Sequence, residues 1–205
     1  LFQAMHPNKT IIDGYMRLTG NLYGTTKSIN GDLAFTAREG YTYQSPLLSN
    51  IFAALNLYKI IKMKNIAIQK EQFTFNRISS NFKLKNSNLS FDDFVLDSDS
   101  IQFSAVGSYN IREKQIDALV GVQPLETIDK AISAIPVVGW VLTGEDKELL
   151  VIAFKAYGDI EDPKIRLATD GTMSKPMADT LLRIYKLPGR IIKKSRELIH
   201  KPENG

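Results

Sequence analysis

The chain has 205 residues, of which 43% are apolar and 23% charged, a balance that supplies a hydrophobic core and excludes an intrinsically disordered protein. It contains no cysteine, which excludes disulfides, thiolate catalysis and cysteine-ligated metals. The net charge of +4 is uneven, because residues 181–205 carry seven basic and two acidic residues and the rest of the chain is close to neutral. The first residue is Leu and no signal segment follows, so we expect a piece of a longer protein whose membrane anchor lies elsewhere.

Alternating apolar and polar residues predict about eight short strands. In residues 29–38, Leu33 and Phe35 lie on one face while Asp32 and Thr36 lie on the other. Comparable patterns occupy residues 11–20, 81–96, 100–110, 115–122, 149–158 and 163–169, with a phase change at Asp92 and Asp93 that predicts a bulge. The short connections between these segments, residues 22–31 among them, are rich in Gly, Asn, Asp and Ser and indicate an antiparallel meander.

Three helices are expected. Residues 45–62 open with a serine cap and a proline and carry a broad apolar stripe, and residues 123–135 repeat the proline opening. The third helix spans about residues 175–198. We therefore predict an α+β fold, with a β-rich domain over residues 1–172 and a basic amphipathic helical tail over residues 173–205.

No constellation of residues predicts catalysis. The two histidines, His6 and His200, lie near the chain ends, away from any scaffold that would position them. Asp92, Asp93, Asp97 and Asp99 form an acidic cluster in which "DSDS" resembles the first half of a calcium loop, but Ile101 and Ser108 occupy later ligand positions and Gln102 occupies the position of the turn glycine. Since the body is neutral and the basic tail has few aromatic residues, nucleic acid is not an expected partner either. We expect no enzyme, no metal and no cofactor.

Three segments in a fixed order carry a resemblance to a known family. They are "GSYNIREKQIDALVGVQP" at 107–124, "IPVVGWVLTG" at 135–144 and "YGDIEDPKI" at 157–165. Their order and spacing resemble the C-terminal region of the AsmA-like family of bacterial envelope proteins, which includes the TamB-like and YhdP-like proteins. The resemblance covers roughly residues 10–170.

The resemblance implies a periplasmic segment of a longer protein anchored in the inner membrane. It implies an open β-sheet curled like a taco shell, whose apolar groove binds or conducts phospholipid acyl chains between the inner and outer membranes. The alternative is a scaffold for outer-membrane assembly that carries no lipid, with assembly proteins as partners. The family offers no catalytic residues.

The expected lipid groove consists of Ile12, Met16, Leu18, Leu33, Phe35, Ile101, Phe103, Ile152 and Phe154. The last six of these should share one concave face, because their strands are in the same period-two phase. The alternation alone favours an ordinary core in which helices cover this face. The resemblance favours an open groove with helices over part of the face.

Residues 135–144 contain an apolar plug formed by Pro136, Val138, Trp140 and Leu142. Glycines on either side of Trp140 permit bends, so the plug either closes one end of the sheet or contacts a membrane interface.

The basic residues of the tail expected at a membrane surface are Arg183, Lys186, Arg190, Lys193, Lys194 and Arg196. Apolar residues recur beside them at helical spacing, so the helix either lies on an anionic membrane or docks on the body with its charges solvated. If it lies on a membrane, residues 181–205 should be removable without loss of the strands.

Overall fold

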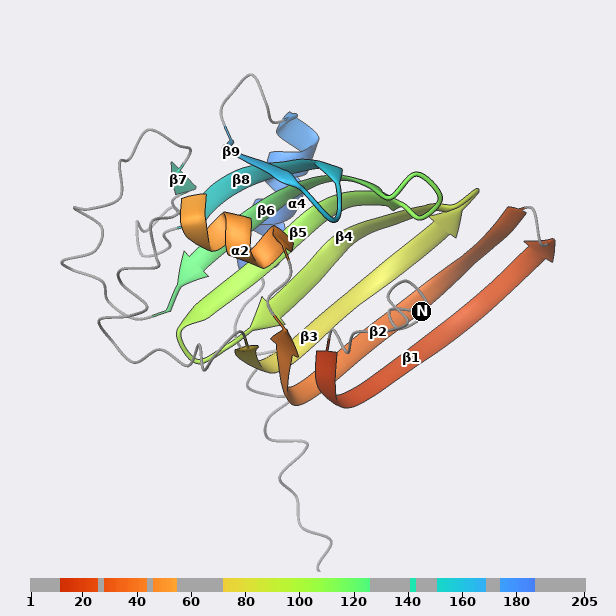
Figure 1. The fold of residues 1–205 in the computed structure, drawn as a ribbon, viewed down its shortest axis with the longest axis horizontal. Coiled ribbons are helices and arrows are strands. Elements are labelled where there is room, and N and C mark those ends of the chain that lie inside the picture. The colour runs from red at the N-terminus through yellow and green to blue at the C-terminus, as the bar shows by residue number, and fades with distance from the viewer. Residues whose placement is uncertain are drawn as a thin grey trace, which may run out of the picture.

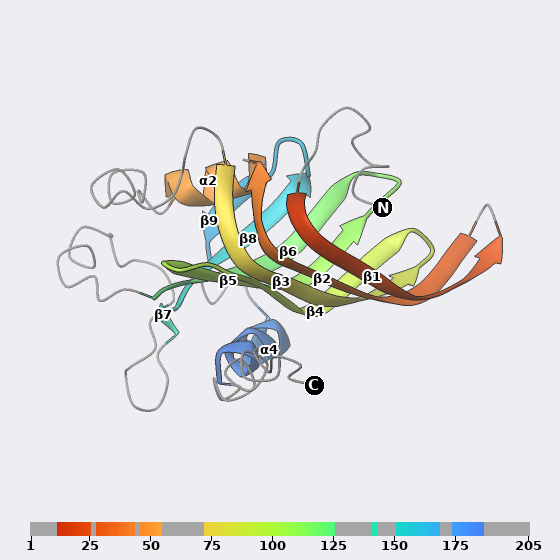
Figure 2. The ribbon, with the colours of Figure 1, turned by 90° about the horizontal axis from the view of Figure 1, so that it is seen from below.

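The computed structural model describes residues 12–25, 28–43, 46–54, 72–125, 141–142, 151–168 and 174–186. Within these ranges the chain forms one curved sheet with a helix on each face (Figure 1, Figure 2). The strands are β1 (Ile12–Thr25), β2 (Ser28–Tyr43), β3 (Gln72–Lys85), β4 (Asn88–Asp97), β5 (Ile101–Asn110), β6 (Gln115–Pro124), β7 (Val141–Leu142), β8 (Val151–Asp159) and β9 (Lys164–Leu167). The helices are α2 (Pro46–Ala54) and α4 (Lys175–Lys186).

The strands pair antiparallel throughout, in the order β1-β2-β3-β4-β5-β6-β8-β7. β7 pairs with the start of β8 and β9 with its remainder, so both lie along the same edge of β8. Among the described strands β1 and this β7–β9 edge do not pair with each other, and the sheet is open. The prediction of an α+β fold built on a curved antiparallel meander is confirmed at this level.

The first strands are longer than the sequence pattern predicted. β1 continues to Thr25 and β2 begins at Ser28, so most of residues 22–31 is strand and not a connection. Gly20, the last residue of the strand expected over residues 11–20, has a φ of 150°, and a Cβ there would lie 2.0 Å from the carbonyl oxygen of Asp32. Glycine here permits the close approach of two paired strands.

Residues 72–80 form the first half of β3, which the sequence pattern did not predict. The buried residues of this strand change phase, from Phe73 and Phe75 to Ile78. A similar change occurs opposite, in β2, where Glu39 has a φ of 49°. Such irregularities break the period-two pattern that marks a strand in a sequence.

The bulge predicted at Asp92 and Asp93 is confirmed, because the register of β4 against β5 shifts between Phe91 and Phe94. The Asp93 carboxylate accepts a hydrogen bond from the backbone N–H of Asn81 at 2.7 Å. It thus satisfies a donor of β3 where the β3–β4 ladder is interrupted.

Both described helices are shorter than the segments expected from the sequence. α2 covers Pro46–Ala54 of the expected residues 45–62, and the remainder lies outside the described residues. The helix expected at 123–135 is wrong at its start, since Gln123 and Pro124 end β6, and residues 126–135 lie outside the described ranges. α4 covers Lys175–Lys186 of the expected 175–198.

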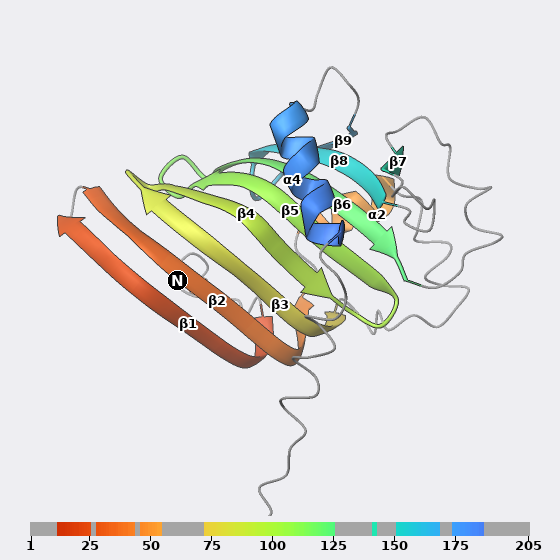
Figure 3. The ribbon, with the colours of Figure 1, turned by 180° about the vertical axis from the view of Figure 1, so that it is seen from behind.

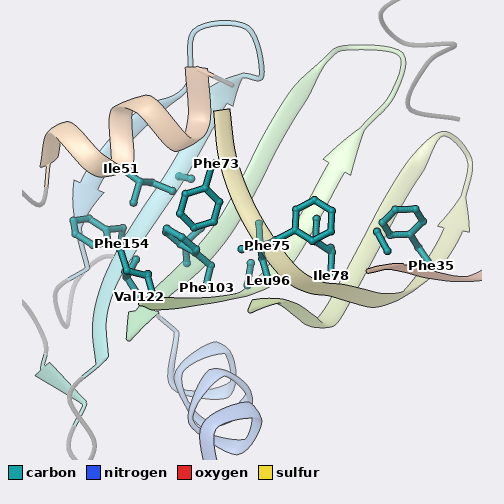
Figure 4. Packing of buried hydrophobic residues seen from close by; sticks show 14 of the residues in the cluster. Phe35, Ile51, Phe73, Phe75, Ile78, Leu96, Phe103, Val122 and Phe154 are labelled. Atoms are coloured by element: carbon teal, nitrogen blue, oxygen red, sulfur yellow. The ribbon is translucent and has the colours of Figure 1, made fainter. Parts of the chain in front are cut away.

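The main hydrophobic core lines the concave face of the sheet, and α2 packs over one part of it, away from Phe35 (Figure 4). Phe52 of α2 packs against Phe73 and Phe103, with each pair of ring centroids 5.7–5.8 Å apart. Tilted and edge-on contacts of this kind add to the stabilisation that burial itself provides.

Replacing Phe103 by Ala should lower the free energy of unfolding by about 3–5 kcal/mol, because it empties the centre of this aromatic cluster. The matched control is Gln102→Ala, since Gln102 faces the opposite side of β5. This substitution should lower the free energy of unfolding by less than ~1 kcal/mol. Urea denaturation followed by circular dichroism measures both values. Equal losses in the two variants would contradict the packing described.

Candidate functional site

Strand register places one continuous apolar surface on the concave face. Residues directly opposite each other on neighbouring strands point to the same side of a sheet. Leu96 of β4 is opposite Phe103, Phe103 is opposite Val122, and Val122 is opposite Ile152. This surface, which we call the concave apolar face, runs from β1 to β9.

The six residues predicted to share this face do so. Leu33, Phe35, Ile101, Phe103, Ile152 and Phe154 all belong to one buried cluster. In Figure 4 the labelled members Phe35, Phe103 and Phe154 point to the side of the sheet on which α2 lies. Each is buried, so in this structure they form the floor of a packed core.

The concave apolar face is exposed at its β1 edge. Met16 and Leu18 are opposite Ala37 and Phe35, and they are 54% and 48% exposed. Ile12, also expected in the groove, is partly buried against the core cluster. The face therefore continues from a covered centre to a solvent-exposed margin.

Two further residues on this margin, Leu22 and Ile29, were not predicted as groove residues. Leu22 is opposite Gly31 and is 56% exposed, while Ile29 is opposite Gly24 and is 44% exposed. Leu22 falls in the segment that was expected to be a connection, whereas Ile29 begins the strand expected over residues 29–38. The alternation of Met16, Leu18 and Leu22 at even positions was the signal that could have extended the strand.

α2 covers only part of the concave apolar face. Ile51 and Phe52 are its buried residues, and Leu47 and Leu48 pack at the side of the cluster. The Asn50 side-chain amide donates to the carbonyl oxygen of Pro163 at 2.9 Å, which fixes the helix beside the β8–β9 turn. Figure 1 shows α2 over the half of the sheet distant from β1.

α4 lies on the opposite, convex face, across β5 and β6 (Figure 3). Leu181 is fully buried there with Val106, Leu119 and Val151. The apolar side of α4 is therefore buried against the sheet. Removing residues 181–205 would expose these strand residues to solvent, so we now expect this truncation to destabilise the sheet, whereas the sequence alone suggested that the strands would stay folded.

The α4 contact contains two buried hydroxyl groups without a hydrogen-bond partner among the described residues, those of Ser104 and Tyr185. Burial of its hydroxyl raises the pKa of Tyr185. Gly121 makes room for the ring, because a Cβ at that position would lie 2.9 Å from the Tyr185 hydroxyl oxygen. Both hydroxyl oxygens are closed to solvent, whereas the Tyr185 residue as a whole is partly buried.

Most of the predicted plug lies outside the described residues. The plug residues outside the described ranges are Pro136, Val138 and Trp140. Whether the plug closes one end of the sheet or contacts a membrane interface is therefore not tested. Leu142 belongs to β7, where its backbone is paired with Val151 at the edge of the sheet.

The described part of the tail holds two of its predicted basic residues. Arg183 is exposed on α4, and Lys186 is the last residue of the helix. Arg190, Lys193, Lys194 and Arg196 lie outside the described residues. None of the helices that the structure describes has the length and hydropathy needed to cross a membrane.

The acidic residues near the β4–β5 turn have structural roles or lie at the surface. Asp93 bonds to β3, and Asp99 accepts a hydrogen bond from the Asn76 side chain at 2.8 Å. Across the described ranges, no group of three or more His, Cys, Asp or Glu side chains is placed to hold a metal ion.

Comparison of the chain with protein-family models, with curated proteins and with solved structures finds no match. The resemblance to the AsmA-like family therefore rests on the order of the sequence segments, and the function that it implies is a proposal.

The raised pKa of Tyr185 predicts a loss of stability in alkali. An unfolded tyrosine releases its proton near pH 10, whereas the buried one holds it to higher pH, so the unfolded state binds fewer protons above pH 10. The free energy of unfolding should thus be unaffected by this group below pH 10 and fall as pH rises above it. In Tyr185→Phe this alkaline loss should be smaller.

The control is Tyr23→Phe, because Tyr23 is 65% exposed. Urea denaturation between pH 8 and pH 11 should give the same alkaline slope for this variant as for the unchanged chain. A Tyr185→Phe slope equal to that of the control would show that the ring is not buried under α4.

Proposed function

We propose that the chain binds phospholipid acyl chains along the concave apolar face, as a non-enzymatic segment of a bacterial envelope protein. In this proposal it belongs to the AsmA-like group and acts in the periplasm between the inner and outer membranes. The observation that carries the proposal is the exposed margin of the concave apolar face at β1 and β2. Apolar side chains there are in register with the buried core and are open to solvent.

The chemistry of this margin suits an acyl chain. Met16, Leu18 and Leu22 line one side of a strand of 14 residues, and an acyl chain needs an elongated apolar surface without hydrogen-bonding demands. Contiguous exposed apolar surface in a folded protein marks binding sites for lipid, protein or membrane.

In this proposal the buried centre of the concave apolar face limits how far an acyl chain extends across the sheet. Phe35 and Phe103 are packed in the core, so lipid occupies the margin without opening the aromatic cluster beneath α2. A charge at Phe103 would act on folding before it acted on binding, since the site is dry and close-packed.

A second candidate function is a scaffold that binds other envelope proteins and carries no lipid. The outer edge of β1 favours it, because among the described strands β1 pairs only with β2. Free backbone groups of an edge strand can bind an added strand of a partner.

We further propose that the tail beyond α4 contacts an anionic membrane surface. Residues 187–205 hold five of the seven basic residues found in residues 181–205. Because α4 uses its own apolar side against the sheet, this contact would be chiefly electrostatic.

The lipid proposal predicts that a Met16→Gln/Leu18→Gln double variant co-purifies with less phospholipid, by about tenfold, because two amides replace apolar contacts. Both residues are about half exposed, so the fold should be retained. Native mass spectrometry and lipid extraction of the full chain measure the occupancy.

The matched control is Arg17→Gln/Thr19→Gln, which changes the alternate residues of the same strand that face away from the concave side. It should leave lipid occupancy unchanged. Absence of phospholipid from the unchanged chain would exclude the lipid function and leave the scaffold as the candidate. Equal losses in both double variants would show that the concave apolar face is not the binding surface.

The membrane proposal predicts that replacing Lys193, Lys194 and Arg196 by Gln weakens binding to anionic vesicles at low salt. High salt should remove most of the difference, because exposed charges are screened within ~8 Å at physiological ionic strength. Co-sedimentation measures binding, and truncation after Lys186 is a suitable second variant because it keeps Leu181 in place. Equal binding of all three proteins would dismiss a membrane role for the tail.

A further inference from the structure

Among the described strands, β1 is an edge strand that pairs only with β2. It is 14 residues long and carries no proline or lysine, the residues that commonly protect an edge from pairing. It is exposed on both faces, since Tyr15 and Tyr23 are 79% and 65% exposed on the convex side while Met16 and Leu22 are exposed on the concave side. A strand of this kind is suited to pair with another strand.

The sequence of β1 is close to a palindrome in side-chain type. Around Thr19, the stretch "GYMRLTGNLYG" places Gly14 and Gly24 at equal distances, then Tyr15 and Tyr23, then Met16 and Leu22. An antiparallel pair of identical strands centred on one residue sets these members opposite each other. The strand is therefore complementary to itself.

In the register centred on Thr19, the side chains that lie opposite each other in the two copies are compatible. Each exposed tyrosine meets a tyrosine on the convex side, and each Met16 meets a Leu22 on the concave side, both of which are favourable cross-strand pairs. Leu18 meets the small residue Gly20, so the two bulky leucines do not collide. A shift by one residue in each strand, centring the pair on Leu18, would set Tyr15 opposite Asn21 and Met16 opposite Gly20 and lose both matches.

Charge is also compatible with this register. The two charged residues of β1 are Asp13 and Arg17. In the register about Thr19, Asp13 is opposite Thr25 and Arg17 is opposite Asn21, so no like charges face each other. Like charges directly opposite would be destabilising.

We propose that a second copy of this chain pairs with β1 through an antiparallel β1–β1 contact centred on Thr19. The two-fold axis is perpendicular to the sheet, so the concave faces of both copies lie on the same side. Met16, Leu18 and Leu22 of the two copies then form one continuous surface, and the exposed margin of each chain becomes the middle of a longer sheet. The pairing does not depend on the lipid function.

Cysteine cross-linking tests the register directly, because the chain has no cysteine of its own. In Thr19→Cys the two thiols are opposite each other, with Cα atoms about 4.5–5.5 Å apart, a separation that a disulfide spans. In the control Asn21→Cys the corresponding residues are four positions apart, roughly 13 Å. We expect a disulfide-linked dimer of the full chain under mild oxidation for Thr19→Cys only.

Charge exchange at the tyrosines tests the same contact without a covalent bond. Tyr15→Lys/Tyr23→Lys sets Lys opposite Lys twice, whereas Tyr15→Glu/Tyr23→Lys sets Glu opposite Lys twice. Both residues are exposed, so both variants should fold alike. By sedimentation equilibrium, the first variant should dimerise about tenfold or more weakly than the second.

Three results would overturn the proposal. The first is a chain that stays monomeric up to millimolar concentration. The second is equally efficient cross-linking through Asn21→Cys and Thr19→Cys, which would exclude this register. The third is equal dimerisation of the two charge variants, which would place the contact on another surface.

Discussion

Strand register is the constraint on which the rest of this structure depends. A slip of one residue between two strands would turn every apolar side chain of one of them to the other side of the sheet. The alignment of Leu96 with Phe103, and of Phe103 with Val122, keeps the aromatic and aliphatic residues of three strands on the face on which α2 lies. Where the alternation breaks, the neighbouring strand changes phase as well. From Ala37 to Gly40 in β2 and from Ile78 to Phe75 in β3, the inward positions shift together.

A different helix packs on each face of the sheet, and the two helices cover different strands. On the concave side, α2 covers the half near β8 and β9 and leaves the margin at β1 exposed. On the convex side, α4 packs over β5 and β6 with Leu181 at the centre. Part of the helix that the sequence suggested for a membrane surface thus packs in the protein core. The apolar stripe of a helix can be buried against a sheet as well as in a membrane.

Much of the sheet could be predicted from the sequence, because β2 alternates over much of its length, β5, β6 and β8 carry apolar residues or glycine at every second position, and a short polar turn joins β5 to β6. The phase change at Asp92 and Asp93 correctly indicated a bulge. The strands that were missed or cut short have the same cause, since Gly20 and Gly24 in β1 and the phase change in β3 imitate the signals of a turn. Local composition does not distinguish a glycine that bends the chain from one that lets two strands approach.

The candidate site was predictable only in part, for a related reason. Period-two phase identified which residues share a face, but it gave no information on which of them are covered. Phe35 and Leu18 are opposite each other in the sheet, yet one is buried and the other is about half exposed. The difference arises from position in the sheet, since a central strand has neighbours on both sides and an edge strand has one. Exposure at the margin is therefore a property of topology, and it makes β1 the place where this fold can acquire either a lipid or another strand.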